Sequence, residues 1–290
     1  MTTAATGSGS GRGSSILADF STEALATYLD DAQQKGGAVA LLPIGSTEPH
    51  GPHLPLATDI LLSEEACRRA VGALAAREVP ALVAPSIGYG ITRYAAGFRG
   101  AVGISEATLV ALITDVARAL LDDGFAHVTL VNNHLEPEHV AAIERASAVI
   151  AAERGPSRIS FPNQLTRRWG RTLTDEFKRG DCHAGRYETS LLLATRPDLV
   201  DGDVAKSLAA VPISLSQAIA AANGASVRFA DIGMQRAYTG APAEATPAEG
   251  EATYQRLVEM IVTEVTDHMR AAVSQENDPA TAPRKEEKQR

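Results

Sequence analysis

Two short segments bring histidines and carboxylates close together in the chain. One reads GSTEPHGPHLPLATD over residues 45–59, and the other reads NNHLE over residues 132–136. The groups they offer are Glu48, His50, His53, Asp59, His134 and Glu136. Imidazoles and carboxylates without thiolates are a ligand set that suits zinc, manganese or iron(II). Carboxylates that converge would also repel one another unless cations lay between them, so we predict a metal site.

A third segment, CHAGRYETS at residues 182–190, adds one more group of each kind. Glu188 opens an apolar run that ends before a proline, so we expect it near the start of a helix. His183 would precede that helix and face the same site. Cys182 is interpreted as a small buried side chain, because cysteine rarely joins a carboxylate-rich site.

The elements that must position these groups follow from two hydrophobic periods. Short continuous apolar runs at 38–44, 81–87 and 128–131 are typical of strands buried on both faces. The first two chemical segments come directly after two of these runs. Residues i and i+2 of an extended chain point to one side. The side chains of Glu48 and His50, and those of His134 and Glu136, would therefore lie on the same side of the chain.

Helical patterns alternate with the strands. Ser105 is a plausible N-cap for apolar residues at three- and four-residue spacing, and Gly124 follows as a stop. Pro137 suits the first turn of another helix, and Thr246 begins a capping box before the last one. This alternation predicts an α/β fold, a parallel sheet with helices on both faces. Ligands bind at the carboxyl edge of such sheets.

Composition limits the class of protein. The chain has 290 residues, 44% of them hydrophobic, with 27 Lys+Arg against 35 Asp+Glu and a formal charge of −8. Such an acidic chain is a poor nucleic-acid binder, and it has no apolar run long enough to span a membrane. The first residues lack the apolar stretch of a secretory signal, so we expect a cytoplasmic location. We predict tails at 1–14 and 274–290, rich in small and polar residues, around one domain at 15–273.

Other enzyme classes lack their motifs here. The turn after the first strand reads GSTEPHG, which fits neither a dinucleotide-binding fingerprint nor a P-loop. No G-x-S-x-G motif of a serine hydrolase is present in the sequence. A metal-dependent hydrolase remains as the leading hypothesis, with a catalytically inactive metal-binding scaffold as the alternative outside enzymes.

The three segments GSTEPHGPHLPLATD, NHLE and HAGRYETSLLLATRPDLV resemble, in order, the motifs of the creatininase (creatinine amidohydrolase) family. The resemblance implies a three-layer α/β/α fold with a binuclear metal site, usually assembled as a homohexamer. It implies hydrolysis of cyclic amides, formamides or related C–N bonds. One branch of the family trims the precursor peptide of a redox cofactor, so peptide trimming is the alternative activity.

The resemblance also assigns roles by position. Glu48 and His50 match one ligand for each of two divalent metal ions, zinc or manganese, with iron as a third candidate. Asp59 matches the carboxylate that bridges them, and His134 matches a ligand of the first ion. His183 matches the histidine that moves protons during ring opening.

Two glutamates compete to complete the shell of the second ion. Glu136 lies two residues after His134, as in creatininase itself, and extended backbone would point both side chains to the metal edge. Glu188 has a structural role without any metal, because a carboxylate at the start of a helix is stabilised by the helix dipole. We therefore expect Glu136 to be the ligand, with a catalytic role, and keep Glu188 as the alternative.

Departures from the family pattern bear on the substrate. The tryptophans that enclose creatinine have no counterpart, and the one tryptophan, Trp169, lies well upstream of His183. The loop 88–103 carries Arg93 and Arg99, which would hold an acidic group or else be plain surface charges. His53 would contact substrate or support the loop. We therefore expect a small amide other than creatinine as substrate.

Overall fold

Four parallel strands form a sheet in the order β2-β1-β3-β4 in the computed structural model, which describes residues 13–223 and 227–276. The strands are β1 (Val39–Ile44), β2 (Ala81–Val83), β3 (His127–Asn132) and β4 (Ile159–Ser160). All six residues of β1 and of β3 are buried, as their continuous apolar sequence predicts. The predicted parallel sheet is confirmed.

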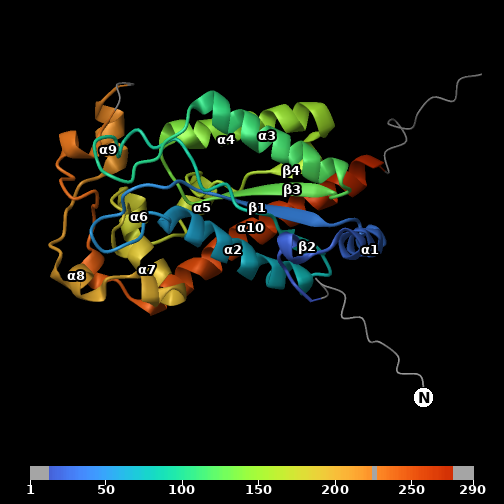
Figure 1. Ribbon diagram of the computed structural model, residues 1–290, viewed down its shortest axis with the longest axis horizontal. Helices are drawn as coiled ribbons and strands as arrows, with labels where there is room; N and C mark the ends of the chain where they lie inside the picture. The colour runs from blue at the N-terminus through green and yellow to red at the C-terminus, as the bar shows by residue number, and fades with distance from the viewer. Residues whose placement is uncertain (1–12, 224–226, 277–290) are drawn as a thin grey trace, which may run out of the picture.

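Helices surround this sheet and continue beyond its carboxyl edge (Figure 1). The α-helices are α1 (Thr22–Gln33), α2 (Thr58–Ala75), α3 (Glu106–Asp122), α4 (Pro137–Arg154), α5 (Arg167–Gly170), α6 (Asp175–Arg179), α7 (Arg186–Thr195), α8 (Gly202–Ser207), α9 (Leu215–Ala221) and α10 (Pro247–Glu276). Short 3-10 helices are η1 (Leu17–Asp19), η2 (Pro156–Arg158), η3 (Pro197–Leu199), η4 (Phe229–Ile232) and η5 (Pro242–Glu244).

Alternate residues of β1 enter two separate hydrophobic cores. Val39 and Leu41 pack with residues of α2, α7 and α10, while Ala40 and Leu42 pack with residues of α1, α3 and α4. Figure 1 shows α3 and α4 on one side of the strands and α2 and α7 on the other. The helices therefore form the outer two layers of the three-layer α/β/α fold that the sequence indicated.

Local signals in the sequence set the helix starts. The Ser105 side chain accepts a hydrogen bond from the backbone N–H of Thr108 at 3.2 Å, and α3 begins after it. Thr246 does the same for the N–H of Glu249 before α10, and Pro137 is the first residue of α4. These three predicted starts are confirmed. The second strand is shorter than predicted because Pro85 lacks an N–H, and pairing returns only at a bridge between Ile44 and Ile87.

The predicted tails fall largely outside the described residues, namely 1–12 and 277–290. At the described end of the first, the Ser14 hydroxyl donates to Asp19 and the carbonyl of Ser15 accepts from Val83. At the other end, α10 continues to Glu276. None of the helices in the described ranges has the length and apolar character that crossing a membrane requires.

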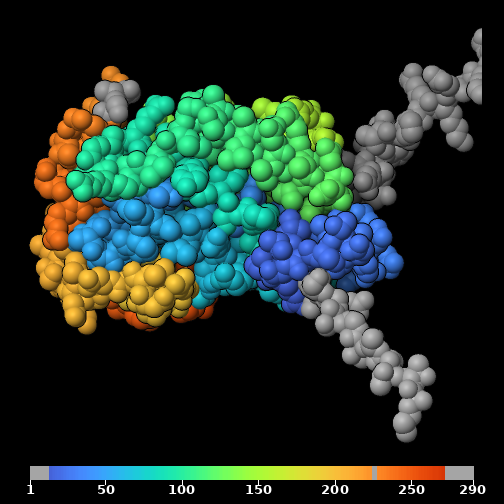
Figure 2. Space-filling view, in the orientation of Figure 1, coloured from blue at the N-terminus to red at the C-terminus, as the bar shows by residue number. Residues whose placement is uncertain are grey.

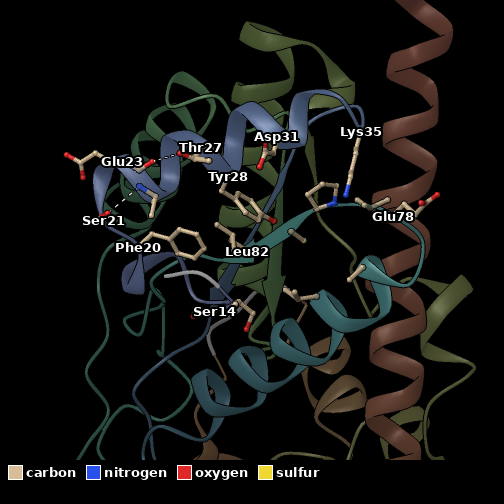
Figure 3. Close-up of a pocket in the computed structure, with 18 residues that line it drawn as sticks. Ser14, Phe20, Ser21, Glu23, Thr27, Tyr28, Asp31, Lys35, Glu78 and Leu82 are labelled. Atoms are coloured by element: carbon tan, nitrogen blue, oxygen red, sulfur yellow. Dashed lines mark hydrogen bonds between the residues drawn. The ribbon is translucent and has the colours of Figure 1, made fainter. Parts of the chain in front are cut away.

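An open cleft of about 930 Å³ lies between α1 and α2, next to the start of β2 (Figure 3). Phe20, Tyr28 and Leu82 are drawn close together in it. No histidine or cysteine is among the described residues that line it. This cleft lies toward the amino ends of the strands, away from the metal-type groups at their carboxyl ends.

His127, buried at the start of β3, should make the stability of the protein depend on pH. Its Nδ1–H donates to the carbonyl of Ser157 at 2.8 Å, and its Nε2 lies 2.7 Å from the Ser160 hydroxyl. Burial lowers the pKa of His127 to about 4, so the folded protein keeps it neutral. Unfolding raises that pKa to about 6.5, so stability is lost as pH falls from about 6.5 towards 4.

The expected loss due to His127 between pH 7 and pH 5 is about 2 kcal/mol in the free energy of unfolding. The matched variant is His127→Asn, which keeps a donor for Ser157 but does not titrate. Urea unfolding at the two pH values should show a smaller pH-dependent loss in the variant than in the wild type. Equal losses in the two proteins would contradict the prediction.

Candidate metal centre

The carboxyl ends of β1 and β3 carry the first two chemical segments to one edge of the sheet. The two strands pair in register from Val39 with His127 to Ile44 with Asn132, so the chain leaves both at the same level. In Figure 2 the residues after α7, in yellow and orange, form the surface at this end of the molecule. The third segment reaches the same place because α7 packs against α2 and α10.

Asp59 occupies the middle of the resulting cluster. It lies in the first turn of α2, where one carboxylate oxygen is 3.0 Å from Nε2 of His50 and the other is 3.0 Å from Nδ1 of His134. Gly45 allows this approach, because a Cβ there would lie 2.8 Å from the backbone N of Ile60. A single carboxylate that faces two imidazoles from its two oxygens has the arrangement of a bridging ligand.

Two glutamates extend the cluster on either side of Asp59. Glu48 Oε1 is 3.2 Å from Nδ1 of His134, and Glu188 Oε2 is 3.5 Å from Nε2 of His50. All these side chains are buried. Three sets have ligand atoms close enough for one ion: Glu48, His50 and His183; Glu48, His134 and Glu136; and His50, Asp59 and Glu188.

Backbone carbonyls fix which ring nitrogen of each histidine faces the cluster. Nδ1–H of His50 donates to the carbonyl of Glu48 at 3.0 Å, and Nε2–H of His134 donates to the carbonyl of Ile91 at 2.6 Å. Nε2–H of His183 donates to the carbonyl of Pro49 at 3.0 Å. The opposite nitrogen of each ring is thereby left facing the carboxylates, as metal ligation requires.

The electrostatics of the cluster call for cations. Burial raises the pKa of Glu188 to about 8. Burial disfavours the charged form of His50, but the Asp59 and Glu188 carboxylates outweigh this and raise the pKa of His50 to about 10. Protonated histidine thus balances the carboxylates in the metal-free chain. A divalent cation would take over that role and let the imidazole be a neutral ligand.

The fit to a metal also shows at one orphaned atom. Oδ2 of Asp59 is buried without a hydrogen bond, although it lies 3.0 Å from Nδ1 of His134. Two ligand atoms that face each other without hydrogen-bond geometry leave a place for a positive ion between them. The residues present therefore fit a carboxylate–imidazole metal site.

The two competing glutamates lie in different places. Glu136 precedes α4, and its two oxygens accept hydrogen bonds from the backbone N–H groups of Arg93 (3.0 Å) and Tyr94 (3.2 Å). Burial raises its pKa to about 7. Glu188 faces His50 and accepts one hydrogen bond from the N–H of Ala184 at 2.7 Å.

The residues predicted to contact substrate lie around the cluster. Nε2 of buried His53 is 2.9 Å from the Thr189 hydroxyl, and its ring meets the edge of Tyr238, which fits a supporting role. Arg93 makes a close ion pair with Glu138, and Arg99 is exposed. None of the three is among the residues that line the cleft above the cluster. Their contact with substrate stays a prediction.

That cleft has a volume of about 520 Å³ and opens above the metal-type groups. Its base includes Glu48, Asp59, His134, His183 and Glu188. Its apolar lining includes Tyr94, Leu135, Leu165, Phe177, Leu215, Ile219 and Phe229. Three cations that the sequence analysis did not single out, Arg167, Arg171 and Lys178, also line it. They lie on or beside α5 and α6, helices too short to show a hydrophobic period.

Comparison with known proteins adds three findings. The mycofactocin precursor peptide peptidase of Mycolicibacterium smegmatis is 32% identical over 232 residues, which cover 76% of this chain and 81% of the relative. The creatinine amidohydrolase of Pseudomonas putida is 30% identical over 183 residues, 58% of this chain and 68% of the relative. A crystal structure of creatinine amidohydrolase (creatininase) aligns with a TM-score of 0.67 and 21% identity, over 92% of this chain and 99% of that chain.

A family model covers most of the chain. The model for creatininase, described as creatinine amidohydrolase, matches residues 23–265, which span every element from α1 into α10 and all the cluster residues. The relatives include both an amidohydrolase and a peptide peptidase, so they establish a hydrolase family without fixing the substrate. The chain belongs to the creatininase family.

Proposed function

We propose that this protein is a binuclear metal-dependent amidohydrolase that cleaves a C–N bond of a small, non-peptide amide, such as a cyclic amide or a formamide. The observation that carries the proposal is the placement of Asp59 between His50 and His134, with Glu48 and Glu188 on either side. Trimming of a peptide end is the second candidate, because the similar M. smegmatis protein is a peptide peptidase.

The donors divide into two shells that share one carboxylate. His50, Asp59 and Glu188, one of the sets whose donor atoms lie together, would hold one ion. Glu48 and His134, with the second oxygen of Asp59, would hold the other. Solved creatininases of this fold include a manganese form and a Zn-Zn form, which supports zinc or manganese here, with iron(II) as a third candidate. When bound, such a pair lowers the pKa of water and polarises a carbonyl oxygen.

His183 is the residue of this chain that would move the proton. Its Nε2–H is held by the carbonyl of Pro49, and its ring lies against Phe229, with ring centroids 4.5 Å apart. Nδ1 is then the free atom, 3.7 Å from Glu48 Oε1 at the base of the cleft. A neutral imidazole there can take a proton from the nucleophile and deliver it to the departing nitrogen.

The two glutamates make a matched pair of variants. Glu188 faces His50, while both oxygens of Glu136 are held by backbone N–H groups. We therefore propose that Glu188 is the third ligand of the ion held by His50 and Asp59. Glu188→Gln should lower the bound metal from two equivalents to one, and Glu136→Gln should keep two. Elemental analysis of both proteins after dialysis against the same metal buffer measures this. The reverse stoichiometry would restore Glu136 as the ligand.

The proposed activity is tested by metal removal and reloading. Chelated protein should be inactive on a panel of cyclic amides, formamides and short peptides, and addition of zinc, manganese or iron(II) should restore turnover. Full activity without metal would exclude the mechanism. A fully loaded protein that turns over no amide and no peptide would instead be a metal-binding scaffold.

We also propose that the protein is a cytoplasmic homo-oligomer, a hexamer by the family resemblance. Large apolar side chains are exposed on the loops that follow β1 and β2, namely Leu56, Tyr89 and Val102. Exposed apolar groups gathered near one another are typical of an interface between protein subunits. Light scattering during size-exclusion chromatography measures the assembly.

A further inference from the structure

One face of α5 supplies positive charge to the cleft. Arg167, Gly170 and Arg171 line the cleft. Gly170 and the C-cap residue Arg171 follow Arg167 by three and four residues, the spacing that places side chains on the same side of a helix. Arg168 between them faces elsewhere, with Nη1 3.2 Å from Glu264 Oε1 and its guanidinium over the ring of Trp169. The neighbouring arginines of this short segment therefore have different surroundings.

The cleft-facing pair lacks counter-charges. Within the ranges 13–223 and 227–276, the guanidinium groups of Arg167 and Arg171 have no hydrogen-bond or ion-pair partner. Arg118 and Arg196, by contrast, are paired with carboxylates. In a chain with a net charge of −8, two adjacent unpaired guanidinium groups at a cleft indicate a place for an anion from outside the chain.

The rest of the cleft shows how that anion would be oriented. The base carries the metal-type cluster, and the apolar side chains of Leu165, Leu215 and Ile219 line the cleft together with the arginines. A ligand that fits has a reactive carbonyl at the base, an apolar part along the wall and a negative group beside α5. Planar carboxylates match the two-pronged donors of guanidinium groups.

We propose that Arg167 and Arg171 bind a free carboxylate of the substrate, so that the substrate class is an amide bearing a carboxylate. This rests on the proposed function, because the scissile amide is taken to lie at the metal cluster. Two sources share this chemistry, an N-acylated amino acid and the C-terminal end of a peptide. The two differ in size, so turnover separates them.

The test compares acids with their neutral counterparts on metal-loaded protein. One pair is N-formylphenylalanine and its carboxamide, followed by formate release. The other is a tetrapeptide with a free or an amidated C-terminus, followed by mass spectrometry. The readout is the ratio of kcat/KM for acid over amide in the wild type, in the Arg167→Gln/Arg171→Gln double variant, and in Arg168→Gln as a control on the same segment.

We expect the double variant to lower this ratio by about 10- to 100-fold, chiefly through a higher KM for the acid, because charge-assisted hydrogen bonds are lost. Arg168→Gln should keep the wild-type ratio. The arm that shows turnover identifies the source of the carboxylate. An unchanged ratio in the double variant would overturn the proposal while leaving the amidohydrolase activity intact.

A binding measurement decides the case if neither arm turns over, because binding of the carboxylate does not depend on the proposed activity. Calorimetry with 3-phenylpropionate and 3-phenylpropionamide on metal-loaded protein compares the same two groups without catalysis. The double variant should bind the carboxylate at least about 10-fold more weakly than the wild type. Equal affinities of the wild type and the double variant for 3-phenylpropionate would show that the carboxylate binds the metal ions directly. That result would overturn the role of the arginines.

Discussion

Asp59→Ala is expected to remove both metal ions and to lower kcat/KM for the amide substrate by about a thousand-fold or more, because water activation and carbonyl polarisation are lost together. The reason is geometric. Each oxygen of this carboxylate lies 3.0 Å from a different imidazole, His50 on one side and His134 on the other. No other single substitution in the cluster removes a donor from both proposed shells.

The measurement is metal content and turnover of the purified variant at several concentrations of added metal. Asp59→Asn is the matched control, because it keeps the volume of the side chain but removes its charge, so it separates loss of the ligand from a cavity next to Gly45. It should behave like Asp59→Ala in metal content. A folded Asp59→Ala protein with two bound ions and normal turnover would show that Asp59 does not bridge.

Sequence periods predicted the elements that carry the site, for a physical reason. Strands buried on both faces must be continuously apolar, so β1 and β3 can be recognised in the sequence. The polar residues that directly follow these parallel strands must lie at one edge of the sheet. Ser105 and Thr246 cap their helices through local hydrogen bonds, which need no knowledge of the rest of the fold. These parts depend on residues that are close together in the chain.

Which of Glu136 and Glu188 is the metal ligand depends on contacts between residues that are far apart in the chain. The i, i+2 argument treats residues 134–136 as extended strand, but β3 ends at Asn132. Glu136 then accepts backbone N–H groups from Arg93 and Tyr94, more than 40 residues away. No pattern near Glu136 encodes that loop. The same limit applies to the proposed carboxylate-binding residues Arg167 and Arg171, since α5 is placed by tertiary packing rather than by a period of its own.

His183 is the second residue for which a large effect is expected, and the outcome discriminates between two roles. Its Nδ1 lies 3.7 Å from Glu48 Oε1, and its ring is 4.6 Å from that of His50 between centroids. Those positions also allow it to complete a metal shell with these two residues. A proton carrier and a ligand therefore predict different metal contents from the same substitution.

We expect His183 to be the proton carrier, because the proposed shell of His50, Asp59 and Glu188 is complete without it. His183→Gln retains an N–H that can donate to the carbonyl of Pro49, yet its amide cannot exchange a proton near neutral pH. Metal content should stay at two equivalents while kcat falls about 10²- to 10⁴-fold, the range for general acid–base groups. Metal loss in proportion to activity would make His183 a ligand.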